Sequence, residues 1–229
     1  MDVQAINIEE NGMRQPVNYV LPPGISRQTD PGQAQLIAQN EQAMVLRVHN
    51  LQYNDALAVY KNVTFDLRNY KHLQMFVHAE NMDSTISKIQ DGELSCFIRL
   101  GSDMVNNYYE YEIPLELTPR GTYNNDNQND RRIVWPAANC FDVNLKAFTN
   151  AKTERNKAKR AGNTGVGNTI PYVIYDDANN LPQNKITILG NPTLEEIETI
   201  MIGVRNRNNH DPEGASGEIW VNELRLSEF

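Results

Sequence analysis

Two glutamates on one face of a predicted strand come closest to an acid and base pair. Glu110 and Glu112 lie two positions apart in the run YYEYEIP. Because side chains alternate along a strand, the two carboxylates share a face about 7 Å apart, within the separation that glycoside hydrolases use. Most such pairs form a solvated strand face. We adopt that interpretation and do not expect an enzyme.

Oxygen ligands for a calcium ion occur at two places. Asp126 and Asp130 lie in one Asn-rich segment, and Asp176 and Asp177 are adjacent. Neither place has the spacing of an EF-hand loop. The four histidines also lack the HExxH spacing of a catalytic zinc site. A structural calcium ion is therefore an open alternative, and no other cofactor is expected.

Large aromatic residues are the type that lines sugar or peptide clefts. Tyr109 and Tyr111 fall on the apolar face of their strand, which predicts a core position. Tyr108 and Trp220 are the candidates for an exposed contact surface, although packing is the favoured interpretation for both.

A predicted β-hairpin at residues 97–117 positions these groups. Two runs with strand composition, 97–100 and 108–117, are separated by small polar residues that suit a tight connection. In the second run we expect the tyrosine face to meet the core and the glutamate face to meet water. Pro114 cannot donate a ladder hydrogen bond, so it predicts an edge position or a bulge.

The rest of the chain also reads mainly as strands. Residues 142–160 predict the one convincing helix, with Asp142 as N-cap and a solvated basic end. Asn and Asp dominate residues 118–132, and this composition predicts an exposed, mobile loop. Residues 1–40 are rich in proline, which predicts an extended N-terminal arm. A sandwich domain is predicted to follow at residues 41–229. Further strands are predicted at 41–50, 58–67, 67–80 (a central one), 185–189, 199–205 and 218–226, with a loop or helical turn at 83–93 and a single helical turn at 194–198.

Composition excludes some partners. The 229 residues carry a formal charge of -8, which argues against a nucleic-acid surface, and no apolar run is long enough for a transmembrane helix. Cys96 and Cys140 form either one disulfide or two buried thiols, and we favour thiols. The ending directly after a strand pattern favours a piece excised from a larger protein.

Two resemblances to known protein families indicate the fold and the function of this chain. The segments GEIWVNELRL and LRNYKHLQMFVHAE are similar to strands of jelly-roll carbohydrate-binding modules of the galactose-binding-like fold. A more specific set closely resembles one region of the SprA/Sov family, the outer-membrane translocons of the type IX secretion system that serve gliding motility. Its motifs are VNYVLPPGI, NEQAMVLRV, DLRNYKHLQMFVHAE, FIRLGSD, NYYEYEIPL, VWP, GNPTLEEIETIMIGVRN and SGEIWVNELRL.

The SprA/Sov resemblance implies a soluble domain, without a membrane span of its own, within a very large β-barrel at the outer membrane and cell surface. Its implied partners are the rest of the barrel chain, secreted cargo proteins and other secretion-system subunits. The implied role is non-catalytic: capping or gating the pore, or contacting cargo or partners. The alternative function is a surface carbohydrate-binding module.

The family has no catalytic residues to transfer, so matched polar positions become candidates for architecture or partner contact. Arg99 and Arg205 lie within apolar strands, where a long cation needs an acidic partner such as Glu110, Glu112 or Glu223. Loss of that partner costs on the order of 3 to 5 kcal/mol. The candidate surface is thus Tyr108, Glu110, Arg99, Arg205 and Trp220, on a mainly β, antiparallel sandwich of jelly-roll type with one helix and long polar loops.

Overall fold

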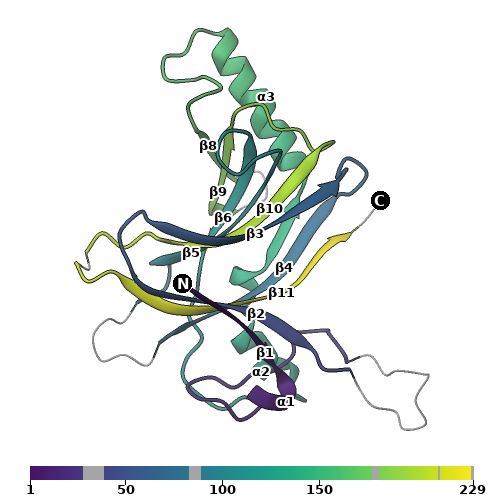
Figure 1. Ribbon diagram of the computed structural model, residues 1–229, viewed down its shortest axis with the longest axis vertical. Coiled ribbons are helices and arrows are strands. Elements are labelled where there is room, and N and C mark those ends of the chain that lie inside the picture. Colours follow the sequence, from purple (N-terminus) through teal and green to yellow (C-terminus); the bar gives the residue numbers. More distant parts are fainter. Residues whose placement is uncertain (28–38, 83–88, 177–180, 211, 228–229) are drawn as a thin grey trace.

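The computed structural model describes residues 1–27, 39–82, 89–176, 181–210 and 212–227. The fold is mainly β and consists of two antiparallel sheets that pack face to face, as predicted (Figure 1). One sheet has five strands in the order β1 (Asp2–Asn7), β2 (Gln42–Leu51), β11 (Ala215–Ser227), β4 (His72–Asn81) and β7 (Phe141–Asn144). The other has six, in the order β3 (Ala56–Phe65), β10 (Ile197–Asn206), β5 (Leu94–Gly101), β6 (Tyr108–Pro114), β9 (Leu181–Leu189) and β8 (Tyr172–Asp176).

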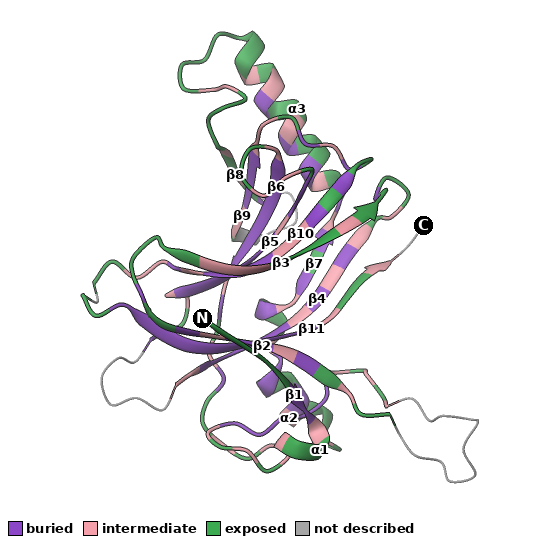
Figure 2. Cartoon of the chain, in the orientation of Figure 1, coloured by how far each residue is buried: buried purple, intermediate pink, exposed green. Residues whose placement is uncertain are grey.

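The main core lies between the inner faces of the two sheets. Alternate residues of β4 are buried there, namely Leu73, Met75, Val77 and Ala79, and β4 lies between β11 and β7 as predicted for a central strand. Burial follows the period of two that a strand imposes. Figure 2 shows the buried residues concentrated where the sheets overlap.

The predicted hairpin is confirmed, since β5 and β6 pair antiparallel from Ser95 and Pro114 to Gly101 and Tyr108. The pairing of β6 with β9 already ends at Glu112 and Lys185. Pro114 therefore lies where β6 has a neighbour on one side only, which is the edge position that its missing N–H requires.

The expectation of a wet glutamate face is wrong. Both faces of β6 are buried, and Glu110 and Glu112 are 2% and 1% exposed. The strand lies in the middle of the sheet, between β5 and β9, so long side chains from the neighbouring strands cover the glutamates.

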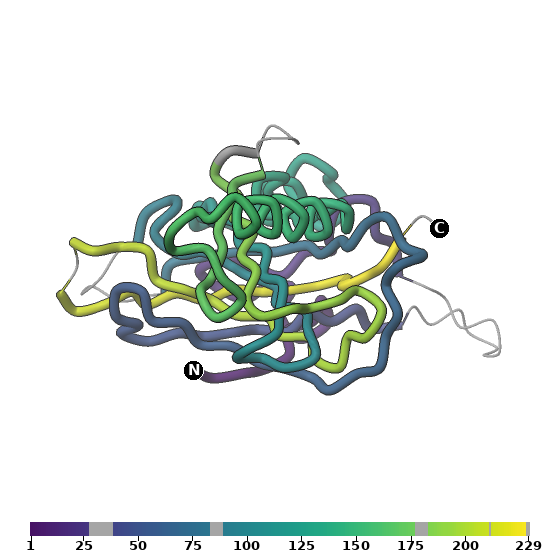
Figure 3. Tube along the Cα trace, turned by 90° about the horizontal axis from the view of Figure 1, so that it is seen from above, coloured from purple at the N-terminus to yellow at the C-terminus, as the bar shows by residue number. Residues whose placement is uncertain are grey.

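The predicted helix starts later than expected. Helix α3 spans Lys146–Arg160, whereas Phe141–Asn144 form β7, in which Phe141 and Val143 are buried. Asp142 is not an N-cap but accepts a hydrogen bond from His72 at 2.8 Å. Phe141 and Val143 are apolar because every second residue of a strand faces the core, and not because they belong to the apolar face of a helix. The helix projects from one end of the sandwich (Figures 1 and 3).

Two further expectations about the loops differ from the structure. The segment 118–132 is not a mobile loop throughout, because Gln128–Val134 form helix α2, followed by the short helix η1 (Ala137–Asn139). No helical turn forms at 194–198, where bends lead directly into β10. Part of the 83–93 prediction, residues 83–88, lies outside the described residues.

The predicted N-terminal arm begins as part of the sheet. β1 pairs with β2 over all six of its residues and is followed by helix α1 (Ile8–Asn11), whose N-cap Asn7 accepts a hydrogen bond from the Glu10 N–H. Past α1 the chain crosses the outward face of the five-stranded sheet. There it forms a second apolar cluster with α2: Ile6, Val17, Tyr19, Val20, Leu21, Ala43, Val45, Val134, Trp135 and Trp220.

Candidate functional site: a charged layer on the six-stranded sheet

The outward face of the six-stranded sheet carries a layer of charged side chains over its four inner strands. Arg99 of β5 lies opposite Glu110 of β6, and Glu112 of β6 lies opposite Lys185 of β9. Arg205 belongs to β10, on the other side of β5. Because the intervening residues of each strand face the core, these charges all project to the same outer side.

Glu110 is held by two arginines. Its Oε2 accepts from Nε and Nη2 of Arg99 at 3.0 and 2.6 Å, and its Oε1 accepts from Nη2 of Arg205 at 3.1 Å. Hydrogen bonds between charged groups are the stronger kind, and two donors of one guanidinium also fix its orientation. Glu110 is therefore a buried structural anion with both oxygens bonded.

Glu112 is more fully surrounded by donors. Lys185 Nζ lies 2.7 Å from its Oε2, which also accepts from Arg205, and Ser95 donates to Oε1 at 2.7 Å. Burial raises the pKa of Glu112, but these donors outweigh it and hold the pKa below its ordinary value. Glu112 is therefore expected to remain ionised at neutral pH.

The two arginine side chains of the layer pack against aromatic rings. The Arg205 guanidinium lies 4.8 Å from the Phe97 ring centroid, and the Arg99 guanidinium lies 3.8 Å from that of Tyr108. Phe97 fits because Gly203 of β10 has no side chain: a Cβ there would lie 2.3 Å from the Phe97 ring. Burial raises the pKa of Tyr108, a shift that the charge of Arg99 opposes.

The structure thus brings together four of the five candidate residues, Tyr108, Glu110, Arg99 and Arg205. It also shows which partners the arginines use, namely Glu110 and Glu112. Sequence reasoning missed Ser95 and Phe97, although both share the alternation of Arg99 along β5. Lys185 had no local signal, because its role depends on the pairing of β9 with β6.

Trp220 lies elsewhere, on the outward face of the five-stranded sheet. It is fully buried, its ring stacks on His78 with centroids 3.7 Å apart, and its Nε1 donates to Glu218 at 2.7 Å. Arg14 of the N-terminal segment joins Glu218 at 2.8 Å and Glu80 at 2.5 Å. Trp220 therefore anchors the segment that covers this sheet and does not belong to the charged layer.

The two candidate calcium positions show no metal-binding cluster within the described residues. No group of three metal-binding side chains occurs among the described residues. Asp130 accepts hydrogen bonds from Asn124 and Asn127, while Asp176 accepts from the Tyr111 hydroxyl at 2.6 Å. Asp177 lies outside the described residues.

Both cysteines are free thiols, as favoured, but only Cys96 is buried, whereas Cys140 is partly exposed. In the part of the chain that is described, no helix is long and apolar enough to cross a membrane.

Comparison with known families identifies the chain. The model of the family SprA_N, described as motility related/secretion protein, matches residues 1–229. The chain belongs to this family. A search of curated proteins found no match. The family match spans both sheets, and with them the charged layer and the segment that covers Trp220.

Proposed function

We propose that this chain is a non-catalytic domain of the outer-membrane translocon of the type IX secretion system. In that assembly it caps or gates the pore, or it contacts cargo and partner subunits. The observation that carries this proposal is the match to a motility and secretion family along the entire sequence. The proposed location is the outer membrane and cell surface, with the rest of the barrel chain as the first partner.

The state of the two glutamates supports a non-catalytic role. A general acid or base must reach a substrate with an exchangeable proton. Glu110 and Glu112 are almost fully buried, and arginine, lysine and serine donors already occupy their oxygens. The pair is therefore better suited to joining four strands, β10, β5, β6 and β9, than to transferring protons.

The distribution of aromatic residues weighs against the carbohydrate-binding alternative. Tyr108 and Trp220 are buried, and the exposed tyrosines of the six-stranded sheet, Tyr60 and Tyr175, lie on its two opposite edge strands. Five strand spacings of about 4.8 Å separate these edges, so the two rings are on the order of 24 Å apart. One sugar ring cannot stack on both.

Secretion measured in living cells tests the proposal. Residues 24–226 of the full-length translocon are replaced by a short flexible linker, and the abundance of the barrel is measured in the same membranes. We expect the barrel to assemble and secretion of a cargo protein to stop. Normal secretion with a normal amount of barrel would contradict both the gating role and the cargo role.

A further inference from the structure

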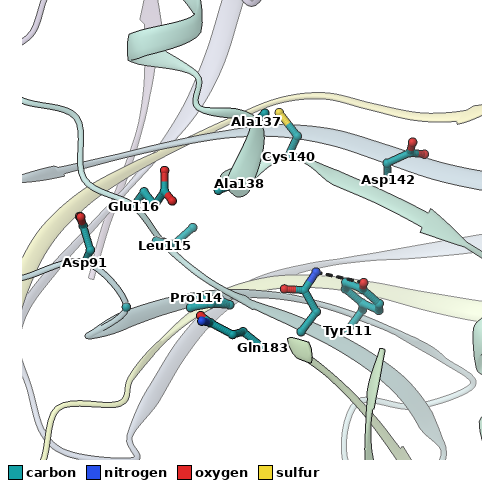
Figure 4. Close-up of a pocket in the computed structure, with 12 residues that line it drawn as sticks. Asp91, Tyr111, Pro114, Leu115, Glu116, Ala137, Ala138, Cys140, Asp142 and Gln183 are labelled. Carbon is teal, nitrogen blue, oxygen red and sulfur yellow. Dashed lines mark hydrogen bonds between the residues drawn. The ribbon is translucent and has the colours of Figure 1, made fainter. Parts of the chain in front are cut away.

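Two hollows meet at the end of the six-stranded sheet where β6 and β9 separate. The first has a volume of about 570 Å³, and the carboxylates of Asp91, Glu116 and Asp142 surround it (Figure 4). The second has a volume of about 530 Å³ and lies beside Arg207 and Tyr175. Both are lined by Gly92, Pro114 and Gln183, so they are neighbours. We call the two hollows together the end groove.

Two charged groups of the end groove, Arg207 and Glu116, have unused bonding capacity. The Arg207 side chain makes no hydrogen bond to a described residue, and its nearest carboxylate oxygen, on Glu112, is 4.0 Å away. The Glu116 carboxylate is exposed and likewise has no hydrogen bond or ion pair to a described residue. A guanidinium offers five N–H donors in a plane, which suits a carboxylate.

A part of β9 along the groove lies outside the strand ladders of the described residues. The ladder between β6 and β9 ends at Glu112 and Lys185. The ladder between β8 and β9 passes from Lys185 directly to Leu181. Among the described residues, the two ladders therefore give Gln183 and Asn184 no partner, and their positions suit hydrogen bonding to an extended segment from outside.

We propose that the end groove binds an extended polypeptide segment that carries charges of both signs. An acidic side chain of this segment pairs with Arg207, and a basic side chain enters the hollow between Asp91, Glu116 and Asp142. The segment's backbone bonds to β9 at Gln183 and Asn184. The choice of a polypeptide as the ligand rests on the proposed function in secretion, whereas the charge pattern rests on the groove itself.

Peptide binding to the complete 229-residue chain tests this inference. The probes are fluorescein-labelled ten-residue peptides in which every second residue is threonine. The others alternate Glu and Lys, or are all Glu, all Lys or all Gln. Fluorescence anisotropy at low salt is expected to show the tightest binding for the mixed Glu and Lys peptide. Equal binding of the mixed and the Gln peptides would overturn the inference, as would stronger competition by an acidic polysaccharide.

Two charge reversals, Arg207→Glu and Glu116→Lys, locate the binding. Each removes an attraction and adds a repulsion, so each is expected to weaken binding of the mixed peptide about tenfold. Lys61→Glu, on the far edge strand β3, is the matched control and should leave binding unchanged. Neither side chain makes a hydrogen bond to a described residue, but Arg207 lies 4.0 Å from the Glu112 carboxylate. The thermal midpoint should therefore stay constant in Glu116→Lys and fall in Arg207→Glu, where two carboxylates become neighbours. Unchanged binding in both reversals would overturn the inference.

Secretion in cells separates this inference from the function on which it rests. If the linker replacement stops secretion but peptides do not bind, the proposed function stands and the groove inference is wrong. If peptides bind through Arg207 and Glu116 while the linker replacement leaves secretion intact, the groove is real and the transport role fails.

Discussion

Arg205 reaches across strand β5 to bind Glu112, although the two residues lie on strands that are not neighbours. The same guanidinium also bonds to Glu110 and covers the ring of Phe97. One side chain therefore links β10, β5 and β6 on the outer side of the sheet. Such a link stabilises the sheet only while every buried charge keeps its partner.

Replacement of Arg205 by methionine should lower the free energy of unfolding by about 3 kcal/mol, because it leaves two buried carboxylates each short of a donor. Urea unfolding measures the change. Arg207→Met is the matched control, since the Arg207 side chain makes no hydrogen bond to a described residue, and its effect should stay within about 0.5 kcal/mol. Equal losses of unfolding free energy in the two variants would contradict the role of Arg205 as the partner of two buried carboxylates.

Gly203→Ala should destabilise the domain by about 1 to 3 kcal/mol through overpacking. The new methyl group would lie 2.3 Å from the Phe97 ring and 2.7 Å from Ala58 Cβ. At Gly167, by contrast, an added Cβ meets no atom within 4 Å, so Gly167→Ala is the control. Thermal unfolding of the single variants and of Gly203→Ala with Phe97→Leu provides the test. Failure of the second change to restore stability would show that the ring is not the cause.

Acid should destabilise the domain through Glu112. Its pKa in the folded state lies below the ordinary value of 4.5, because Arg205, Lys185 and Ser95 outweigh the effect of burial. As the pH falls, the unfolded chain therefore takes up a proton at Glu112 before the folded chain does. The stabilisation that ionised Glu112 gives the folded state is present above pH 4.5 and is lost as the pH falls below that value. Asp103, whose pKa is lowered to about 2 by hydrogen bonds in the hairpin loop that outweigh burial, acts in the same direction.

Urea unfolding at pH 6, 4.5 and 3 measures this dependence. The Glu112→Gln variant should be less stable than the original chain at pH 6 but should lose less stability between pH 4.5 and 3. Parallel pH profiles for the two proteins would exclude Glu112 as a source of the acid sensitivity.

The two thiols should differ in reactivity. Cys96 is completely buried, and burial raises its pKa above the ordinary range, so alkylation should require unfolding. Cys140 is partly exposed, but burial and then Asp142 raise its pKa to about 11, so it should react slowly at pH 8 and faster as pH rises. Iodoacetamide labelling followed by mass spectrometry distinguishes the two. Rapid labelling of Cys96, or an intramolecular disulfide, would contradict the structure.

Local patterns in the sequence were sufficient to predict much of the fold. Alternation of apolar residues located β2 and β4, and a near-continuous apolar run located β10. The polar residues between two runs of strand composition located the hairpin of β5 and β6. These signals are local because each strand must place every second side chain in the core. The need of Arg99 and Arg205 for acidic partners followed from the same reasoning, since a long cation within an apolar strand cannot remain unpaired.

Pairing between distant segments accounts for what the pattern missed. The sequence pattern makes Glu110 and Glu112 look solvated. They are buried because Arg205 and Lys185 come from strands 73 to 95 residues further along the chain. In sequence, Phe141–Asn144 resemble the start of a helix, but they form a strand because they pair with β4. The end groove likewise exists because β9 leaves β6 after Lys185. Burial and charge pairing depend on which strands become neighbours, and neighbours distant in sequence leave no periodic signal in either segment.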